Sequence, residues 1–441
     1  MSHLLKPHLG QPLPNVARAA GSWVWDAAGR RYLDGSSGAV VVSLGHAHPE
    51  VLRALHEQSR LVTYAVRAQF TSEPAERLAD RLAELAPGDL DSVLLVNSGS
   101  EAVESAAKLA LQHWSERGRP EKHRFVSRRA SYHGTTLGAL SLSGHPVRRR
   151  HFESLLHAFP AVPQPSRYRC ESSAACPPCD LSCADAFDAA IRAVGADRVA
   201  GVIVEPVVGA TGGAVVAPPG YHQRLREICD HHDALLIADE VMTGVGRCGS
   251  FLAMERWDTV PDLAVLGKGL GAGYVPVAAV LARRHVVEAI AAGSGLITGG
   301  HTYSANPLAA AVALAVVDIT IRDRLPERAR RLEPILGAAL RDLMESHPHV
   351  GDVRGLGLLW GLELVADRSS RRSYPRERMV TERFLAACRA NGLLLYPASD
   401  GHNDAVLIGP PLNVTDDELD LLVTRLDTSL SALEAELPAS G

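Results

Sequence analysis

The chain has 441 residues, of which 46% are hydrophobic, and its formal net charge is -5. This size predicts a globular protein with large cores and two or three domains. Arg148–Arg150 is its one run of three adjacent basic residues, so the charge pattern excludes a typical nucleic-acid binder. Prolines interrupt the N-terminus where a signal peptide needs an apolar core, and the longest apolar run, Leu308–Val317, has ten residues. We therefore expect a cytoplasmic protein without a membrane span.

Two N-terminal stretches have clear local patterns. Ser22–Gly45 alternates apolar and polar residues around the turn signal Asp26–Gly29, which predicts a β-hairpin. From Ser72 to Ala86 the apolar residues follow helical spacing, with a proline in the first turn, where a helix tolerates it. We therefore expect a hairpin and then a helix.

The stretch from Val93 to Ala110 passes from an apolar strand into a strongly helical pattern. Ser98 and Glu101 have the spacing of a capping box, so one interpretation is simply a well-capped helix. In the other, the N–H groups of Gly99 and Ser100 and the positive end of the helix form an anion site that suits a phosphate. The residues alone favour neither interpretation over the other.

Two further strands lead to candidate ligand residues. Tyr132 follows the predicted strand Arg124–Ser127 and precedes a glycine, where its ring can lie flat against an aromatic ligand. The alternative is a turn that packs against the next helix. The strand Val199–Val204 leads to Glu205, and a buried acid at that position must be paired or protonated.

Four of the seven cysteines are close together in the sequence. Cys170, Cys176, Cys179 and Cys183 have the spacing C-x5-C-x2-C-x3-C, with two prolines inside it. The spacing is compatible with a zinc site. The alternative is a set of reduced thiols, or a disulfide, in a proline-rich surface loop.

The main candidate site lies between Ala234 and Pro276. The apolar runs Ala234–Ala238 and Leu263–Leu266 are predicted to be buried parallel strands, and Asp239 and Lys268 come directly after them. Ligands bind at the carboxyl ends of parallel strands, so both side chains can face one ligand. Lys268 also lies among glycines, as a Schiff-base lysine requires. The alternatives are a solvated surface lysine and a capping aspartate.

A dinucleotide motif also occurs in this region. Gly244–Gly249 fits G-x-G-x-x-G, but a dinucleotide site also needs a helix that begins at the third glycine and an acid after the next strand. That strand is followed by Lys268, so we reject a nicotinamide enzyme. A nucleotide-phosphate loop is rejected as well, because Lys268 is followed by glycine rather than Ser or Thr.

The last part of the chain alternates long amphipathic helices with short apolar strands. The helices are predicted at Glu327–Ser346, Val380–Asn391 and Thr415–Glu436, and one strand at Leu358–Leu364. This pattern predicts a small α/β domain, which the N-terminal hairpin joins. Arg354 precedes that strand, and we expect it to form a structural ion pair.

Several motifs, in order along the chain, resemble the class III, or ω-amino acid type, aminotransferases, which use pyridoxal phosphate. They include SGSEAVE, DEVMTGVGRCG, GKGLGAGY and HTYS. The resemblance implies the fold type I α/β architecture, with a mostly parallel central sheet in a large domain, and a small domain built from both termini. The implied divisions are an N-terminal segment at 1–60, a coenzyme-binding domain at 61–323 and a C-terminal small domain at 324–441.

The resemblance also implies a role for individual residues. Lys268 holds pyridoxal 5'-phosphate as an internal aldimine and later moves the proton, Asp239 pairs with the pyridine nitrogen, and Thr302 reaches the phosphate of the neighbouring subunit of a homodimer. Tyr132 stacks on the coenzyme ring. The full set implied to bind the coenzyme is Ser98, Gly99, Ser100, Tyr132, His133, Glu205, Asp239, Val241, Lys268 and Thr302, with no metal ligand.

The chain departs from ornithine-type and GABA-type members of that family at two positions. Where those members carry an arginine that binds a carboxylate and a glutamate that neutralises it, this chain has Leu407 and Ala210. An α-carboxylate normally needs a bidentate guanidinium. We therefore expect the keto acid to be held elsewhere, with Arg67 as the candidate, or one substrate to lack an α-carboxylate.

The expected function is the transfer of an amino group from an amine or amino acid donor to an α-keto acid. One alternative is another reaction of the same scaffold, either decarboxylation-dependent transamination or amino-group migration. The other is a non-catalytic metal-binding protein that retains the fold. No nucleic acid or membrane partner is expected.

Overall fold

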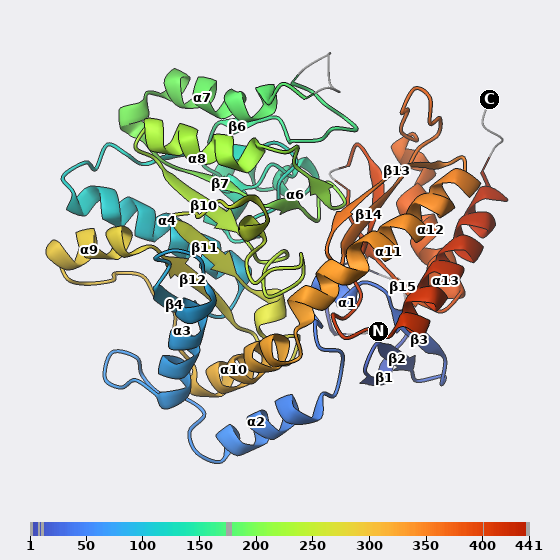
Figure 1. The fold of residues 1–441 in the computed structure, drawn as a ribbon, viewed down its shortest axis with the longest axis horizontal. Helices are drawn as coiled ribbons and strands as arrows, with labels where there is room; N and C mark the ends of the chain where they lie inside the picture. The colour runs from blue at the N-terminus through green and yellow to red at the C-terminus, as the bar shows by residue number, and fades with distance from the viewer. Residues whose placement is uncertain (1–2, 8, 10–12, 173–178, 400, 438–441) are drawn as a thin grey trace.

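The computed structural model describes residues 3–7, 9, 13–172, 179–399 and 401–437. Its described part contains a central seven-stranded sheet and, beside it, two four-stranded sheets built from the two ends of the chain (Figure 1). Within the described residues, no helix has the length and apolar content needed to cross a bilayer.

The central sheet has the strand order β4-β12-β11-β10-β7-β5-β6. All neighbouring pairs are parallel except the two that involve β12, which is antiparallel to both β4 and β11. The mostly parallel sheet expected from the sequence is therefore confirmed. Its strands are β4 (Ser92–Val96), β5 (Arg124–Arg128), β6 (Ala161–Val162), β7 (Val199–Val204), β10 (Leu235–Asp239), β11 (Leu263–Leu266) and β12 (Ala278–Ala282).

Helices cover both faces of this sheet (Figure 1). Alternate residues of one strand face opposite layers: Ile237 packs with α4, whereas Leu236 and Ala238 pack with α7 and α8. A strand that is covered on both faces has a continuous run of apolar residues, and the sequence has such runs at these strands. The helices are α3 (Glu73–Leu85), α4 (Gly99–Glu116), α7 (Ser182–Val194), α8 (Tyr221–His231), α9 (Arg284–Ala292) and α10 (Pro307–Arg322).

One of the two small sheets combines residues from both ends of the chain, and the other is built from the C-terminal part alone. The predicted hairpin is confirmed: β2 (Trp23–Asp26) pairs with β3 (Arg31–Asp34), and β1 (Val16–Ala20) adds to its edge. β15 (Leu393–Leu394) completes that sheet in parallel with β3. The second sheet contains β13 (Val350–Leu356), β14 (Leu359–Leu364), β17 (Asp404–Ile408) and β16 (Tyr396–Pro397).

Three C-terminal helices pack around these small sheets: α11 (Leu325–Ser346), α12 (Val380–Ala390) and α13 (Asp416–Glu434). Each begins and ends within two residues of its predicted position. Glu418 on α13 accepts hydrogen bonds from the side chains of Ser22 and Trp23, so the last helix is attached to the N-terminal hairpin.

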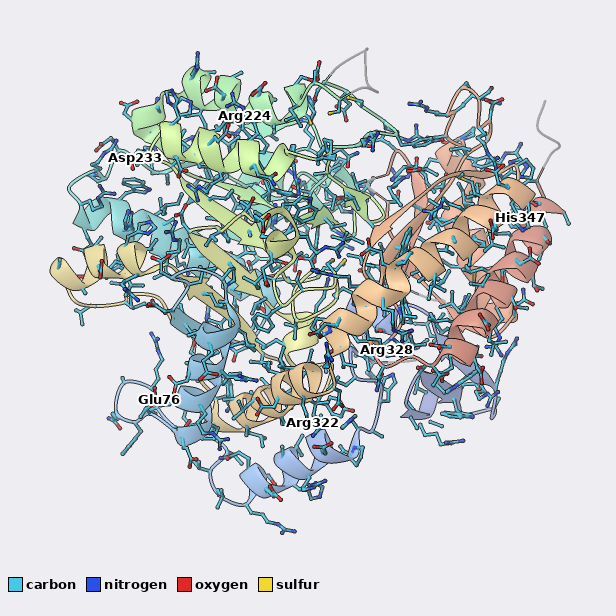
Figure 2. The ribbon with its side chains drawn as sticks, viewed as in Figure 1. Glu76, Arg224, Asp233, Arg322, Arg328 and His347 are labelled. Atoms are coloured by element: carbon cyan, nitrogen blue, oxygen red, sulfur yellow. The ribbon has the colours of Figure 1, made fainter. Side chains whose placement is uncertain are left out.

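Two ion pairs tie helices together at the molecular surface (Figure 2). Arg322, at the end of α10, forms a double hydrogen bond with Glu50 of α2 (Pro49–Ser59), at 2.6 and 2.9 Å. Arg328 of α11 pairs with Asp416 of α13 at 3.2 Å. Exposed pairs of this kind contribute little stability each, so the apolar cores carry the fold.

Candidate active site

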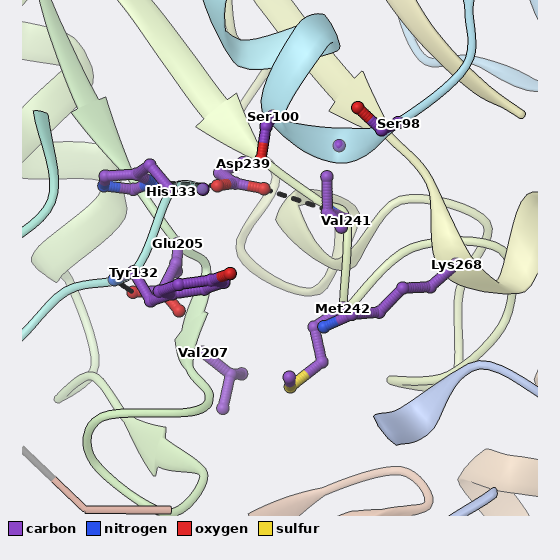
Figure 3. A pocket seen from close by; sticks show the side chains of 12 residues that line it. Ser98, Ser100, Tyr132, His133, Glu205, Val207, Asp239, Val241, Met242 and Lys268 are labelled. Atoms are coloured by element: carbon purple, nitrogen blue, oxygen red, sulfur yellow. Dashed lines mark hydrogen bonds and ion pairs between the residues drawn. The ribbon is translucent and has the colours of Figure 1, made fainter. Parts of the chain in front are cut away.

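A cavity opens at the carboxyl ends of β7, β10 and β11 and beside the start of α4 (Figure 3). Nine of the ten residues expected to bind a coenzyme lie in its wall. The lining residues are Ser98, Gly99, Ser100, Tyr132, His133, Gly134, Glu205, Val207, Asp239, Val241, Met242 and Lys268. Sequence reasoning missed Gly134, Val207 and Met242, although each lies within three residues of a predicted site residue.

Asp239 is held rigidly at the end of β10. Its Oδ2 accepts a hydrogen bond from Nδ1 of His133 at 2.7 Å, and its Oδ1 accepts from the backbone N–H of Val241 at 3.1 Å. Both His133 and Asp239 are buried. A buried carboxylate needs such donors, and they fix the direction in which Asp239 faces the cavity.

Lys268 enters the cavity from the turn after β11 (Figure 3). Its backbone has a φ of 40°, a conformation that is uncommon outside glycine and is often found at functional sites. Burial lowers the pKa of its amine to about 8, against the opposing effect of the Asp239 and Glu205 carboxylates. The lowered pKa makes the nucleophilic free amine more abundant near neutral pH than it is in an ordinary lysine.

The turn before α4 forms another wall of the cavity. Ser98 is the N-cap and its Oγ accepts the N–H of Glu101, as predicted. The reciprocal half of the predicted capping box is wrong, because the Glu101 carboxylate accepts from Asn97, one residue earlier. The Ser100 hydroxyl accepts the N–H of Thr135. The helix therefore presents its positive end to the cavity.

Tyr132 and Glu205 complete the opposite wall. The backbone N–H of Tyr132 donates to Oε2 of Glu205 at 3.3 Å, and the N–H of Gly209 donates to Oε1 at 3.0 Å. Burial raises the pKa of the Glu205 carboxyl, against the opposing effects of His133 and Arg128. Glu205 is thus the buried, hydrogen-bonded acid that the sequence required.

Glycine at position 134 is a steric requirement of this site. Its φ is 133°, and a Cβ there would lie 2.4 Å from Oγ of Ser100. Any larger residue would push the loop after Tyr132 away from the start of α4. Gly134 therefore keeps the two walls of the cavity at their present separation.

The two positions where the sequence lacks expected charges lie in one apolar cluster. Ala210 and Leu407 are both buried there, together with Val207, Met242 and the partly buried Tyr396. No side chain of this set can bind a carboxylate through an ion pair. Because the arginine and the glutamate that would neutralise it are both absent, the wall is apolar and no charge in it is left without a partner.

Thr302 and Arg67 do not line the cavity of their own chain. Thr302 is exposed in the turn before α10, and Arg67 donates a 2.5 Å hydrogen bond to the carbonyl oxygen of Gly299. Tyr64 contacts Tyr303 with 5.8 Å between the ring centroids. The loop around Arg67 and the turn that carries Thr302 therefore form one exposed surface.

Arg354 is structural, as expected. It pairs with Asp352 at 2.5 Å and Glu363 at 2.7 Å, and its Nε donates to the carbonyl oxygen of Gly213 at 2.8 Å. The rejected dinucleotide motif, Gly244–Gly249, is a series of turns followed by a short 3-10 helix at Ala253–Trp257. No helix begins at its third glycine.

Three of the four clustered cysteines are among the described residues. Cys170, Cys179 and Cys183 are free thiols in the structure, and Cys176 lies outside the described residues. Burial is the main cause that raises the pKa of the Cys183 thiol to about 12, and the neighbouring Cys179 and Cys170 contribute to the same rise. Among the described residues, no group of three or more His, Cys, Asp or Glu side chains is arranged to hold a metal ion. A zinc site that includes Cys176 stays a hypothesis.

Comparison with known proteins decides the family, because residues 6–430 match the model of aminotransferase class-III. The chain belongs to the class III aminotransferase family. It is 44% identical to the uncharacterized aminotransferase YodT of Bacillus subtilis, over 99% of both chains. It is 38% identical to an adenosylmethionine-8-amino-7-oxononanoate aminotransferase of Geobacter sulfurreducens, over 94% of this chain and 91% of that protein.

A solved structure supports the same assignment. An amine transaminase from an uncultivated Pseudomonas species, in its pyridoxal phosphate-bound form, has a TM-score of 0.92 and 34% identity, over 98% of this chain and 99% of that one. This class III aminotransferase therefore has the fold type I architecture, transfers amino groups and depends on pyridoxal phosphate.

The residues of the cavity fit that coenzyme. An aldehyde requires a reactive amine, a pyridine nitrogen requires an acidic partner, and a phosphate requires N–H donors at a positive helix end. Lys268, Asp239 and the turn Ser98–Ser100 supply these three groups around one cavity. Because His133 forms a hydrogen bond with Asp239, this buried carboxylate is already in position without a ligand.

Proposed function

We propose that Lys268 is the residue that carries pyridoxal phosphate and moves the substrate proton in this aminotransferase. The main support is that Lys268 and Asp239 face one cavity from neighbouring parallel strands. The lowered pKa of the Lys268 amine supports both tasks, because a free amine would hold the coenzyme and could accept a proton from the substrate. Bound pyridoxal phosphate supplies the electron sink for the carbon atom that loses this proton.

The other cavity residues bind and orient. Asp239 keeps the ring nitrogen protonated, and His133 holds the Asp239 carboxylate in place. The N–H groups of Gly99 and Ser100, with the Ser98 and Ser100 hydroxyls, bind the phosphate at the start of α4. Tyr132 lies against the ring, and Val241 and Glu205 complete the wall around it.

We propose a homodimer in which Thr302 completes the site of the neighbouring subunit. Thr302 is exposed and lies outside the cavity of its own chain. The loop around Arg67 and the segment that carries Thr302, which contact each other, expose large apolar side chains: Leu61 is 79% exposed, Phe70 66%, Leu296 67% and Tyr303 59%. Large exposed apolar surfaces of this kind mark protein interfaces. We name these four residues the apolar patch.

The division into segments 1–60, 61–323 and 324–441 is part of this proposal, with the cavity in the middle segment. We also propose a cytoplasmic location, which the free thiols of the six described cysteines support. The donor is an amine or amino acid and the acceptor an α-keto acid.

A two-step measurement tests the catalytic assignment. The loaded enzyme is mixed with a series of amines in the absence of keto acid, and the visible band of the coenzyme is followed. We expect one amine to bleach the band stoichiometrically and a keto acid to restore it. Lys268→Ala should slow the amine step by a factor of about 10²–10⁴, the usual contribution of a positioned acid–base group. Turnover of an amine without any acceptor, or release of carbon dioxide, would instead indicate another reaction of this scaffold.

A further inference from the structure

The substrate carboxylate needs a cationic partner that the apolar wall at Ala210 and Leu407 does not provide. Two arginines considered from the sequence are already engaged elsewhere: Arg67 with the carbonyl oxygen of Gly299, and Arg354 with two carboxylates. The guanidinium of Arg128 is fully buried and donates to the backbone carbonyl of Glu205, so it cannot reach a substrate in the cavity.

Arg148 is the arginine that approaches the cavity. It lies in the short helix α6 (Pro146–Arg149), and its guanidinium carbon is 4.9 Å from the centroid of the Tyr132 ring. Its charge also acts on Lys268. Burial lowers the Lys268 pKa most, the Asp239 and Glu205 carboxylates oppose this, and the Arg148 charge lowers the pKa to a smaller extent. It also opposes the rise in the pKa of Tyr132 that burial causes. The guanidinium thus lies beside Tyr132 of the cavity wall, while Arg148 itself lines a neighbouring groove.

The neighbouring arginines of the same run have other tasks. Arg149 donates to the carbonyl oxygens of Leu140, Ser141 and Ser143, and so closes the end of the preceding helix α5 (Leu137–Leu142). The Nε of Arg150 contacts the exposed ring of His151 at 3.1 Å. No carboxylate among the described residues forms an ion pair with Arg148, whose guanidinium is exposed.

The groove that contains Arg148 is continuous with the apolar wall. Its lining includes Arg148 and Ala210 together with Pro397, Ser399 and residues 401–404. Two acids also line it: Asp404, which accepts from the N–H and hydroxyl of Thr381, and Glu382 on α12. The lining has two arginines, Arg148 and Arg376, and two carboxylates, Asp404 and Glu382, so the attraction for an anion comes from the Arg148 guanidinium and not from a net charge of the groove.

We propose that Arg148 binds the carboxylate of the α-keto acid acceptor, in the role that Leu407 cannot fill. The inference rests on the transaminase function proposed above. Arginine suits this role because its planar guanidinium binds a carboxylate through two parallel hydrogen bonds. An amine donor without a carboxylate makes no use of Arg148 and occupies the apolar wall instead. One site thereby accepts two chemically different substrates in turn.

The test compares Arg148→Ala and Arg148→Lys with Arg150→Ala, a control from the same run. Pyruvate is the acceptor, 1-phenylethylamine is the donor without a carboxylate, and lactate is an unreactive carboxylate whose dissociation constant is measured by calorimetry. We expect Arg148→Ala to raise the KM for pyruvate and the Kd for lactate by about ten- to a hundredfold, as for the loss of a charged hydrogen bond. Arg148→Lys should recover part of the loss, and Arg150→Ala should match the wild type.

The amine half-reaction separates recognition from structural damage. With 1-phenylethylamine, Arg148→Ala should lose much less rate than with pyruvate, because no substrate carboxylate is lost. The effect of the Arg148 charge on the Lys268 pKa acts on both half-reactions alike. Unchanged pyruvate and lactate constants would overturn the proposal, and so would an equal loss in both half-reactions. If the wild type reacted with no amine at all, the transaminase function would fail, and the lactate constant would still decide whether Arg148 binds carboxylates.

Discussion

His133 and Asp239 show how single residues set the properties of the site. The imidazole N–H of His133 donates to the Asp239 carboxylate at 2.7 Å, and neither side chain contacts solvent to any large extent. Removing one partner of a buried charged hydrogen bond leaves the other uncompensated. The direction in which the Asp239 carboxylate faces therefore depends on its hydrogen bond with His133.

We predict that His133→Phe weakens coenzyme binding. The ring is retained in size, but Asp239 loses its donor, so the dissociation constant of pyridoxal phosphate should rise by about ten- to a hundredfold. Titration of the coenzyme-free protein, followed by absorbance, measures this constant. His231→Phe, on the exposed side of α8, is the matched control and should bind as the wild type does. Equal affinity of both variants would contradict the role of His133.

A pH profile tests the Lys268 amine directly. Burial lowers its pKa from 10.5 to about 8, so the free amine becomes abundant as the pH rises through about 8. The rate at which the coenzyme-free protein takes up pyridoxal phosphate should rise roughly tenfold per pH unit below this value and level off above it. Asp239→Asn removes a carboxylate that raises the Lys268 pKa, so its profile should shift to lower pH. A wild-type rate that still climbs tenfold between pH 9 and 10 would refute the assignment.

Some site residues were predictable from the sequence and others were not. Asp239 and Lys268 each follow an apolar run, so the rule for strand ends was enough to bring them together. Arg148 carries no such signal, because its place depends on how the loop after α5 folds back over Tyr132. The partnership of His133 with Asp239 also joins residues far apart in the sequence, and only the tertiary structure shows it.

Helix α4 is the element that combines stability with ligand binding. Its first turn is capped by Ser98, and the same turn lines the cavity. Helix α13 has a complete capping box, in which Thr415 and Glu418 each accept from the backbone N–H of the other, at a place remote from the cavity. The two caps allow the structural and binding contributions to be separated.

We predict different outcomes for the removal of these two caps. Ser98→Ala and Thr415→Ala should each lower the free energy of unfolding by about 1 kcal/mol, the typical value of an N-cap side chain. Only Ser98→Ala should also weaken pyridoxal phosphate binding, because Ser98 lines the cavity. Denaturant titrations and coenzyme titrations on both variants check this. A loss of coenzyme affinity in Thr415→Ala would show that stability alone accounts for the effect.

Several element types followed from the sequence, and so did the parallel direction of β10 and β11, but the direction of β12 did not. The apolar runs at β10 and β11 predicted buried strands, and amphipathic spacing predicted the C-terminal helices. The antiparallel direction of β12 has no signature in Ala278–Ala282, since a short apolar run is the same pattern in either direction. Direction is set by the connections to β11 and α9, which are tertiary properties.

For the whole molecule, the apolar patch tests the proposed dimer. Leu296→Asp replaces an exposed apolar side chain of the patch by a charge, so it should dissociate the dimer and reduce activity if Thr302 serves the partner's site. Sedimentation equilibrium and activity at matched concentrations measure both effects. Ile335 lies on α11 and is 56% exposed, so Ile335→Asp is the control and should remain dimeric and active. A monomeric wild type with full activity would contradict the shared site.

The parallel pairing of β3 with β15 has a consequence for synthesis of the chain. Leu33 and Leu393 are direct partners, so the N-terminal hairpin lacks its last strand until almost the whole polypeptide has left the ribosome. Contacts between such distant positions form slowly and leave apolar surface open in the meantime. Truncated polypeptides that end before β15 should associate with chaperones or aggregate, even though they contain every residue of the cavity.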